Sequence, residues 1–318
     1  MHELKREHFS RVEPLFHDLI ALHGSVSATL SGAAEGHILV DDLSAPSVAL
    51  LDGPEGFYLG GGPIAGRDYF ALRQIIPPWA YLYPSKEWLA AREWAMPHPH
   101  MQRHDRVYLA TRPSDKPMPA LSAPFELVLE QDGPLSSAVL CDGETVAHCR
   151  PDMIVDDRME IGVWTRPDMR RRGLASAVVR ASRGLAAAAG IRSVGWHCHA
   201  SNAGSIAVAR RAGFEPAATY VAWSASLPAE NAGDLQPDRC RSLAQAFEAG
   251  RQDFDWLDFH AAVAWSEAGE TERALVALER LVEGPWMGRS DWLEGHWALQ
   301  RLRHEPRFQR ALEIQAGK

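Results

Sequence analysis

The chain of 318 residues is long enough for two or three domains, and its composition, 46% hydrophobic and 23% charged, is that of a folded protein. With 41 acidic and 33 basic side chains, its formal charge is −8, which argues against a general nucleic-acid binder or a coat on an anionic membrane. The four cysteines stand far apart and form no C-x-x-C pair, which excludes a disulfide scaffold and a zinc ribbon.

The first residues and the hydropathy of the chain indicate a cytoplasmic protein. Met1–Arg6 leads into a mixed polar helix and not into the apolar core of a signal peptide. No stretch approaches the roughly 18 apolar residues that a membrane span requires. We therefore expect reduced thiols and no membrane partner.

The first segment, residues 1–120, begins with an amphipathic helix and continues with short strands. Apolar residues between 15 and 22 have helical spacing. Apolar runs at 37–40, 47–51 and 57–59 each end in Asp, Gly or Pro, which is typical of an antiparallel meander. We expect further strands at 79–83 and 106–111 and a helix over 86–96.

The second segment, residues 124–226, follows a connector with four prolines at 112–124. Its pattern predicts strands at 125–130, 137–141, 144–149, 159–165, 191–197 and 214–224. The Asp142-Gly143 pair is the strongest hairpin signal in the chain. Helices are predicted at 174–189, which ends at a glycine, and at 205–212.

The third segment, residues 236–318, follows a polar linker at 228–237 and is predicted to be all-α, a region of helical hairpins. The small residues and leucines spaced along 261–278 resemble one tetratricopeptide unit, and 303–308 resembles the closing segment of such arrays. One repeat cannot bury its own face. This tail is expected to dock on the rest of the chain, to self-associate or to bind a protein partner.

The most informative stretch is a basic glycine turn between a strand and a helix. The strand over 159–165 leads through Arg170-Arg171-Arg172-Gly173 directly into the helix that begins at Leu174. The first turn of a helix has unpaired N–H groups and a partial positive charge, so this turn can hold a pyrophosphate. Alternatively, these arginines only form the start of a helix on a solvent-exposed surface and bind no ligand.

The order of these elements resembles the GCN5-related N-acetyltransferase (GNAT) superfamily, whose Q/R-x-x-G-x-G/A turn is matched by Arg170–Ala175. The likeness continues in Asn202, which opens a short helix, and in the Gly213-Phe214 pair eleven residues later. It covers about 100 residues. The resemblance implies an α/β (α+β) fold with a mixed twisted sheet flanked by helices, and acetyl-CoA as the acyl donor.

The first segment resembles a narrower bacterial subgroup, in which a degenerate half precedes the catalytic one. Its G-x-x-x-V-D-D-x-x-x-P-x-x-x-x-L pattern is matched from Gly36 to Leu50, and its E-I-G-x-x-T pattern from Glu160 to Thr165. This resemblance implies tandem GNAT-like halves, with a degenerate half at 1–120 and the catalytic domain at 124–226.

The superfamily transfers the acetyl group by direct attack of an amine on the thioester, and the resemblance assigns roles to matching residues. The cofactor would be held by Val163 (through its main chain), Trp164, Thr165, Arg170, Arg171, Arg172, Gly173, Leu174, Ala175, Asn202 and Ser205. Glu160 would be the general base, directly or through a water molecule, with Asp156 and Asp157 as alternatives. The tyrosine that often protonates the thiolate is replaced by Ala209, so Tyr220 is the candidate acid.

The sequence thus predicts an N-acetyltransferase acting on a primary amine, expected to belong to a small molecule. A protein lysine or N-terminus is an alternative acceptor, and a catalytically silent acyl-CoA-binding regulatory protein is an alternative from another class. His197, Cys198 and His199 are adjacent and cannot all converge on one ion, so we expect no metal.

Overall fold

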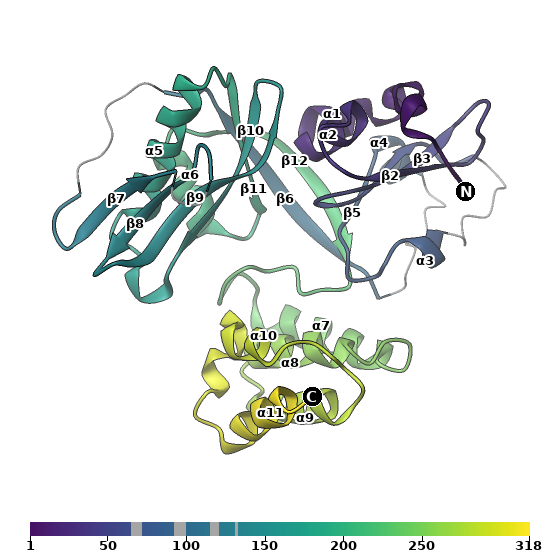
Figure 1. The fold of residues 1–318 in the computed structure, drawn as a ribbon. Coiled ribbons are helices and arrows are strands. Elements are labelled where there is room, and N and C mark those ends of the chain that lie inside the picture. The colour runs from purple at the N-terminus through teal and green to yellow at the C-terminus, as the bar shows by residue number, and fades with distance from the viewer. Residues whose placement is uncertain (65–71, 92–99, 115–120, 131–132) are drawn as a thin grey trace. The chain divides into compact units, whose positions relative to one another are not determined.

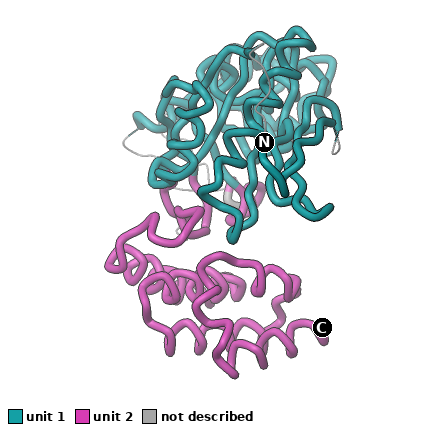
Figure 2. The backbone as a smooth tube through the Cα atoms, turned by 90° about the vertical axis from the view of Figure 1, so that its left-hand side faces the viewer, with its two compact units in different colours: residues 1–71, 81–95, 105–222 teal, residues 72–80, 96–104, 223–318 magenta. Residues whose placement is uncertain are grey.

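A computed structural model describes residues 1–64, 72–91, 100–114, 121–130 and 133–318. The chain divides into two compact units (Figure 2), which are described separately. The first comprises residues 1–71, 81–95 and 105–222, and the second comprises residues 72–80, 96–104 and 223–318.

In the described residues, twelve strands form one mixed sheet in the order β1-β2-β3-β4-β5-β12-β6-β11-β10-β9-β8-β7 (Figure 1). The strands are β1 (His2–Glu3), β2 (His37–Val40), β3 (Val48–Gly53), β4 (Gly56–Gly61), β5 (Leu82–Pro84), β6 (Gln102–Thr111), β7 (Phe125–Leu129), β8 (Ser137–Cys141), β9 (Glu144–Val155), β10 (Arg158–Thr165), β11 (Ser193–His199) and β12 (Glu215–Ser224).

Six α-helices of the described residues lie between strands in the sequence, and five follow β12. The helices are α1 (His17–Leu22), α2 (Gly24–Ser31), α3 (Leu72–Ile75), α4 (Lys86–Ala90), α5 (Leu174–Ala188), α6 (Ala203–Arg211), α7 (Pro237–Gly250), α8 (Leu257–Glu267), α9 (Thr271–Glu283), α10 (Ser290–Gly295) and α11 (Pro306–Ala316). Short 3-10 helices span Arg6–Arg11, Glu13–Phe16, Pro167–Met169 and Trp297–Leu302. No helix in the described part of the chain is long and apolar enough to cross a membrane.

The same order of elements occurs twice along the sheet. Strands β2, β3 and β4 form an antiparallel meander, and β5 follows α3 and pairs parallel to β4. Strands β8, β9 and β10 form a second antiparallel meander, and β11 follows α5 and pairs parallel to β10. We call residues 1–114 of this sheet and its helices the N-terminal half, and residues 121–224 the C-terminal half.

Each half gives its last strand to the other half. Strand β6 ends the N-terminal half but pairs antiparallel with β11, from Val194↔Thr111 to His199↔Arg106. Strand β12 ends the C-terminal half but lies between β5 and β6. Figure 1 shows these two strands running between the two sides of the sheet. The halves are therefore joined by main-chain hydrogen bonds as well as by side chains.

Local signals explain the elements around the basic turn. Asp142 and Gly143 have φ values of 52° and 81°, the left-handed pair that a tight hairpin turn between β8 and β9 requires. Helix α5 packs on β8, β9 and β10, and Leu174, Val178 and Val179 on its apolar face are buried. This packing fixes the start of α5 beside the end of β10.

The V-D-D-x-x-x-P pattern of the N-terminal half closes the loop between β2 and β3. The Asp41 carboxylate accepts hydrogen bonds from the N–H groups of Ser47 and Val48, at 2.9 and 3.0 Å. The Asp42 carboxylate accepts two more within the same loop. The pattern is thus explained by backbone hydrogen bonding in a turn.

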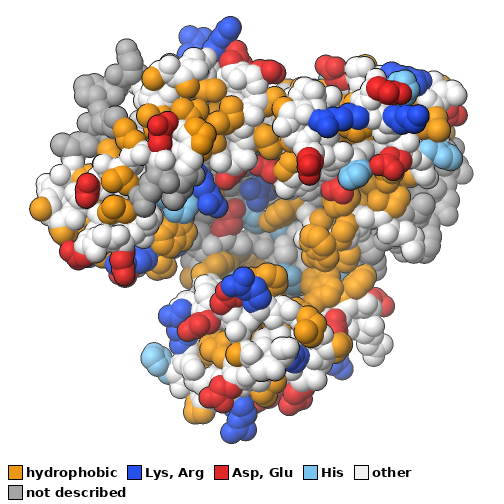
Figure 3. All heavy atoms as spheres, viewed as in Figure 1, with side chains coloured by type: hydrophobic (Ala, Val, Ile, Leu, Met, Phe, Trp, Pro, Cys, Tyr) orange, Lys and Arg blue, Asp and Glu red, His pale blue; other side chains and the backbone are white. Residues whose placement is uncertain are grey.

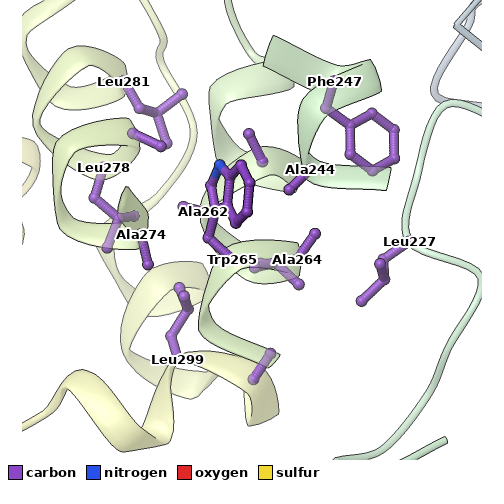
Figure 4. Close-up of a cluster of buried hydrophobic side chains, with 14 of the residues drawn as sticks. Leu227, Ala244, Phe247, Ala262, Ala264, Trp265, Ala274, Leu278, Leu281 and Leu299 are labelled. Atoms are coloured by element: carbon purple, nitrogen blue, oxygen red, sulfur yellow. The ribbon is translucent and has the colours of Figure 1, made fainter. Parts of the chain in front are cut away.

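The second unit has its own core, built from α7 to α11. Figure 4 shows Trp265 of α8 among Ala244 of α7 and Ala274 and Leu278 of α9, and the Trp265 side chain is fully buried. Arg280 joins α9 to α8 through Asp258, at 2.7 Å. The small residues Ala244 and Ala274 let these helices approach closely.

The structure differs from the predicted elements at a few places. Strand β5 is Leu82–Pro84, while Trp79, placed in that strand from its hydrophobicity, is 65% exposed. Strand β9 continues to Val155, past the Pro151 that was expected to lie beyond its end. Helix α4 ends at Ala90, and the remainder of the predicted helix includes residues outside the described ranges.

Candidate active site

Strands β10 and β11 separate after their first three residue pairs. They pair in parallel from Arg158↔Ser193 to Glu160↔Gly195 and no further, although β10 continues to Thr165 and β11 to His199. Beyond that point β10 pairs with β9 and β11 pairs with β6. The sheet is therefore split between two neighbouring strands, with Glu160 at the point where the split begins and Val163 on its edge.

The basic turn follows the open end of β10. Arg171 has φ 64° and Gly173 has φ 81°, both in the left-handed region, so the chain reverses sharply before α5. Arg170, Arg171 and Arg172 are exposed, and a Cβ built on Gly173 would meet nothing within 4 Å. The first turn of α5 is thus open to solvent beside three guanidinium groups, an arrangement suited to a phosphate.

The other residues expected to bind the cofactor differ in their exposure to solvent. Leu174 is buried in the core, so only its main chain can face a ligand, while Trp164 is 41% exposed and stacks on His148. Asn202 caps α6 by accepting a hydrogen bond from the Ser205 N–H at 2.9 Å. The Ser205 hydroxyl accepts one from the Trp196 indole at 2.9 Å. Both polar side chains are therefore held in place by the fold.

Glu160 is buried and links the two halves. Its side chain is 3% exposed, and Oε1 accepts a hydrogen bond from the Gly24 N–H, 2.8 Å away at the start of α2. Oε1 also pairs with Arg158, and His197 Nε2 lies 3.5 Å from it. Burial acts to raise the pKa of Glu160, but His197, Arg158 and the Gly24 N–H outweigh it and hold that pKa below its ordinary value.

Arg158 completes this link from the same face of β10. Its guanidinium donates to the carbonyls of Ile20, Ala21 and Leu22 at the C-terminal end of α1, as well as to Glu160. A cation lies at the negative end of α1 and an anion at the positive end of α2, so both charges complement the helix dipoles. The break between α1 and α2 is thereby fixed to β10.

A second polar chain runs from Glu160 to β12. His197 Nδ1 lies 2.9 Å from the Tyr220 hydroxyl, which also accepts a hydrogen bond from Arg106 Nε at 3.1 Å. Burial raises the pKa of Tyr220 to about 12, so the phenol keeps its proton at neutral pH. The structure therefore brings the two catalytic candidates, Glu160 and Tyr220, to the same imidazole.

Aromatic rings from both halves surround this imidazole. His23 stacks on His197 at 5.3 Å and also lies against Tyr58, Tyr83 and Tyr220. Burial, reinforced by the charges of His197 and Arg158, holds the pKa of His23 well below its ordinary value. A neutral, largely aromatic wall thus faces the ionised Glu160.

The remaining candidates lie elsewhere or have structural roles. Asp156 and Asp157 are exposed in the turn between β9 and β10, where Asp157 pairs with Arg192 at 3.0 Å. Ala209, at the usual tyrosine position, is fully buried in the core of the C-terminal half. No group of three or more potential metal ligands occurs in the described residues.

Sequence reasoning did not single out Arg158, Arg106 or His23, and it considered His197 only for metal binding. Arg158 could have been found, because alternate residues of a strand share a face and Arg158 stands two residues before Glu160. His23 and Arg106 belong to the N-terminal half, and only the fold brings them to Glu160. Figure 3 shows a recess in this face of the sheet with acidic, basic and histidine side chains in it.

Solved structures with a similar fold are known. A GCN5-related N-acetyltransferase-like protein from Streptococcus suis has 22% identity over 69% of this chain and 98% of its own, with a TM-score of 0.51. A GCN5-related N-acetyltransferase from Sphaerobacter thermophilus has 15% identity over 70% of this chain and 93% of its own, with a TM-score of 0.50. These likenesses show a shared mixed α/β fold. No curated protein matches the chain.

A family match, and not the fold alone, identifies the protein as an acyltransferase. Residues 88–214 match the family described as Acetyltransferase (GNAT) family. The chain therefore contains a GNAT acetyltransferase domain, and that domain includes the basic turn, Glu160 and His197. The match begins in α4 and ends just before β12, so the donated strand β6 lies within it.

Proposed function

We propose that the protein is an N-acetyltransferase that takes the acetyl group from acetyl-CoA and gives it to a primary amine of a small molecule. The observation that carries this proposal is the split between β10 and β11 directly before an exposed arginine-rich turn that opens α5. A split sheet leaves main-chain groups available to an extended amide-containing ligand, and the turn suits its pyrophosphate.

The residues of this region fit acetyl-CoA. Gly173 has open space where a side chain would stand, and Arg170, Arg171 and Arg172 supply positive charge to the diphosphate. Val163 lies on the edge of β10 beyond its last pair with β11, so its main chain can bind the acyl carbonyl. Bound there, the thioester would supply an activated acyl group for direct attack by an amine.

Glu160 is the proposed general base, and its burial means that it works through His197 or a water molecule. A neutral imidazole has one nitrogen without a proton, so His197 can accept the proton that the nitrogen still carries after the free amine has attacked the thioester. The proton that the ammonium loses to become this amine goes to solvent. The ionised Glu160, 3.5 Å from Nε2, would stabilise the positive charge that His197 gains. His197, Arg158 and the Gly24 N–H hold the pKa of Glu160 low, so the carboxylate is ionised when the reaction begins.

Tyr220 is the proposed general acid. Its phenol is protonated near neutral pH and lies 2.9 Å from His197 Nδ1, so it can give its proton to the leaving sulfur and regain one from His197. Arg106, 3.1 Å from the phenol oxygen, would stabilise the phenolate between these two transfers. The proton that the nitrogen loses after attack thus reaches the thiolate through His197 and Tyr220.

Two finer proposals concern the rest of the chain. We propose that residues 1–120 are a degenerate GNAT-like half, which the repeated order of strands and helices supports. We propose that residues 236–318 are a tetratricopeptide-like helical tail, which the paired helices α8 and α9 support. A protein acceptor delivered by that tail is the alternative to a small amine.

The test is calorimetric titration with acetyl-CoA, followed by an assay of thiol release against a library of amines. Gly173→Asp should abolish acetyl-CoA binding by placing a carboxylate against the pyrophosphate. Gly173→Asn is the matched control, because Asn has the same shape, tolerates positive φ and lacks the charge. Equal binding by the two variants would contradict the placement of the pyrophosphate. Binding without turnover on any amine would favour the silent acyl-CoA-binding protein.

A further inference from the structure

A carboxylate of the N-terminal half stands on a turn beside the aromatic rings of the candidate site. Glu55 lies in the turn between β3 and β4 and is half-buried. A Cβ built on Gly56, the next residue, would lie 3.2 Å from Tyr83 Cε2, and one built on Gly53 would lie 3.1 Å from the Ser25 hydroxyl. Within the part of the chain that the structure describes, Glu55 makes no hydrogen bond and no ion pair, although it interacts electrostatically with Glu160 and Asp152. A half-buried carboxylate in this state lacks the cation that would compensate its charge.

The neighbouring cations already have other partners. Arg158 is engaged by Glu160 and by three carbonyls at the end of α1, and Arg106 donates to Tyr220. The titratable and charged groups that interact with Glu55 are Glu160 on β10, Asp152 on β9, Arg106 on β6, Arg158 on β10, Tyr58 on β4, Tyr83 on β5 and Tyr220 on β12. Burial and the two carboxylates together raise the pKa of Glu55 to about 7.

Independent of this acidic group, buried polar atoms at the same place also lack partners. His23 is 2% exposed and its Nε2 makes no hydrogen bond, while its ring contacts Tyr58, Tyr83 and Tyr220. Glu160 Oε2 is likewise buried without a partner. Buried polar atoms are normally satisfied, so these atoms indicate that a polar ligand belongs beside the aromatic rings.

We propose that Glu55 binds the ammonium group of the acceptor, and that it restricts acceptors to alkylamines, which are positively charged near neutral pH. Aromatic faces and a carboxylate together attract an alkylammonium ion, whereas an uncharged arylamine gains nothing from the carboxylate. Glu55 positions the acceptor, and the proton is still removed through His197. This inference rests on the proposed function and gives the acceptor its chemical class.

The test measures binding to the full chain and does not depend on turnover. Hexylammonium chloride and its uncharged counterpart 1-hexanol are titrated calorimetrically into wild type, Glu55→Gln and the control Asp52→Asn. Asp52 is an exposed carboxylate on the same hairpin, and the charged group that it interacts with is His37. Thermal unfolding of all three proteins verifies that each is folded.

Wild type should bind hexylammonium at least about tenfold more tightly than 1-hexanol, as expected for a charged hydrogen bond. Glu55→Gln should bind hexylammonium about tenfold more weakly than wild type and should bind 1-hexanol equally well. Asp52→Asn should bind both compounds as wild type does. Because Glu55 must be ionised, hexylammonium binding by wild type should weaken as the pH falls through about 7 and stay level in Glu55→Gln.

Absence of hexylammonium binding at millimolar concentration, equal affinity for 1-hexanol, or unchanged binding by Glu55→Gln would each overturn the role of Glu55. Failure of the proposed function has a different signature. In that case acetyl-CoA would not bind, or no amine would release thiol, while the charge preference for hexylammonium would persist.

Discussion

Replacing Glu160 by Gln tests whether this carboxylate holds the two halves together, in addition to its proposed role as the base. The substitution keeps the shape and leaves an oxygen for the Gly24 N–H and Arg158, but it removes the charge. Arg158, whose side chain is 17% exposed, then loses its only anionic partner among the described residues and keeps the three carbonyls of α1.

The magnitude follows from those contacts. Removing one member of a buried ion pair costs about 3–5 kcal/mol because the other charge is left uncompensated. The carbonyls around Arg158 and the remaining acceptor at residue 160 reduce that cost, so we expect Glu160→Gln to lower the free energy of unfolding by about 2–3 kcal/mol. The control Asp157→Asn breaks an exposed pair with Arg192 and should cost less than about 1 kcal/mol.

The assay is urea unfolding combined with hydrogen exchange of peptides covering residues 17–31 and 158–165. Exchange should accelerate in both peptides for Glu160→Gln, because the link holds α1 and α2 to β10. The pKa of Glu160 is lowered in the folded protein, so its stabilising effect is complete above the unfolded value and disappears as the pH falls through the folded value. The difference in the free energy of unfolding between wild type and Glu160→Gln should therefore be largest near neutral pH and should disappear in acid.

Equal unfolding of Glu160→Gln and wild type, within about 0.5 kcal/mol, would refute this account of the link. A fully active Glu160→Gln enzyme would separately remove Glu160 as the base. The two measurements are independent, because urea unfolding reports the stability of the protein and thiol release reports its turnover.

Three further predictions concern the acid, the core and the tail. Tyr220→Phe removes the phenol between His197 and Arg106 and should lower turnover by about 100-fold or more while leaving calorimetric acetyl-CoA affinity unchanged; unchanged turnover would exclude Tyr220 as the acid. Ala209→Tyr places a ring in a fully buried site, so it should lower the melting temperature and bring no gain in thiol release. Leu278→Ala removes a side chain that is 1% exposed and should cost the second unit about 2–5 kcal/mol in urea unfolding, and a smaller effect would show that this core is loosely packed.

The sequence predicted those features whose signals are local. The Asp142-Gly143 turn, the meander over β2, β3 and β4, and the helix after Gly173 each depend on residues that are neighbours in the chain. The structure has each of them close to the predicted bounds. Trp79 was misplaced because hydrophobicity alone does not show whether a residue is buried.

The surroundings of the candidate site could not be predicted in this way. Glu160 was chosen from its strand, but its partner Gly24 is 136 positions away in the sequence. Glu55 follows a proline and precedes a glycine, so its sequence context is that of a solvated turn residue, and only the fold places this turn beside Tyr83. The exchange of β6 and β12 is invisible to any local pattern, because each strand has the same composition whichever half it pairs with.

The exchange of β6 and β12 between the halves determines when the sheet can form during synthesis. The ribosome finishes β6 well before β11, its partner at Val194↔Thr111, exists. Strand β5 likewise cannot complete its pairing until β12, the last strand of the sheet to be synthesised, is available. An N-terminal half released early would expose unpaired strand edges, which are prone to aggregate. The halves are therefore expected to reach their folded state together, only after residue 224 has left the exit tunnel.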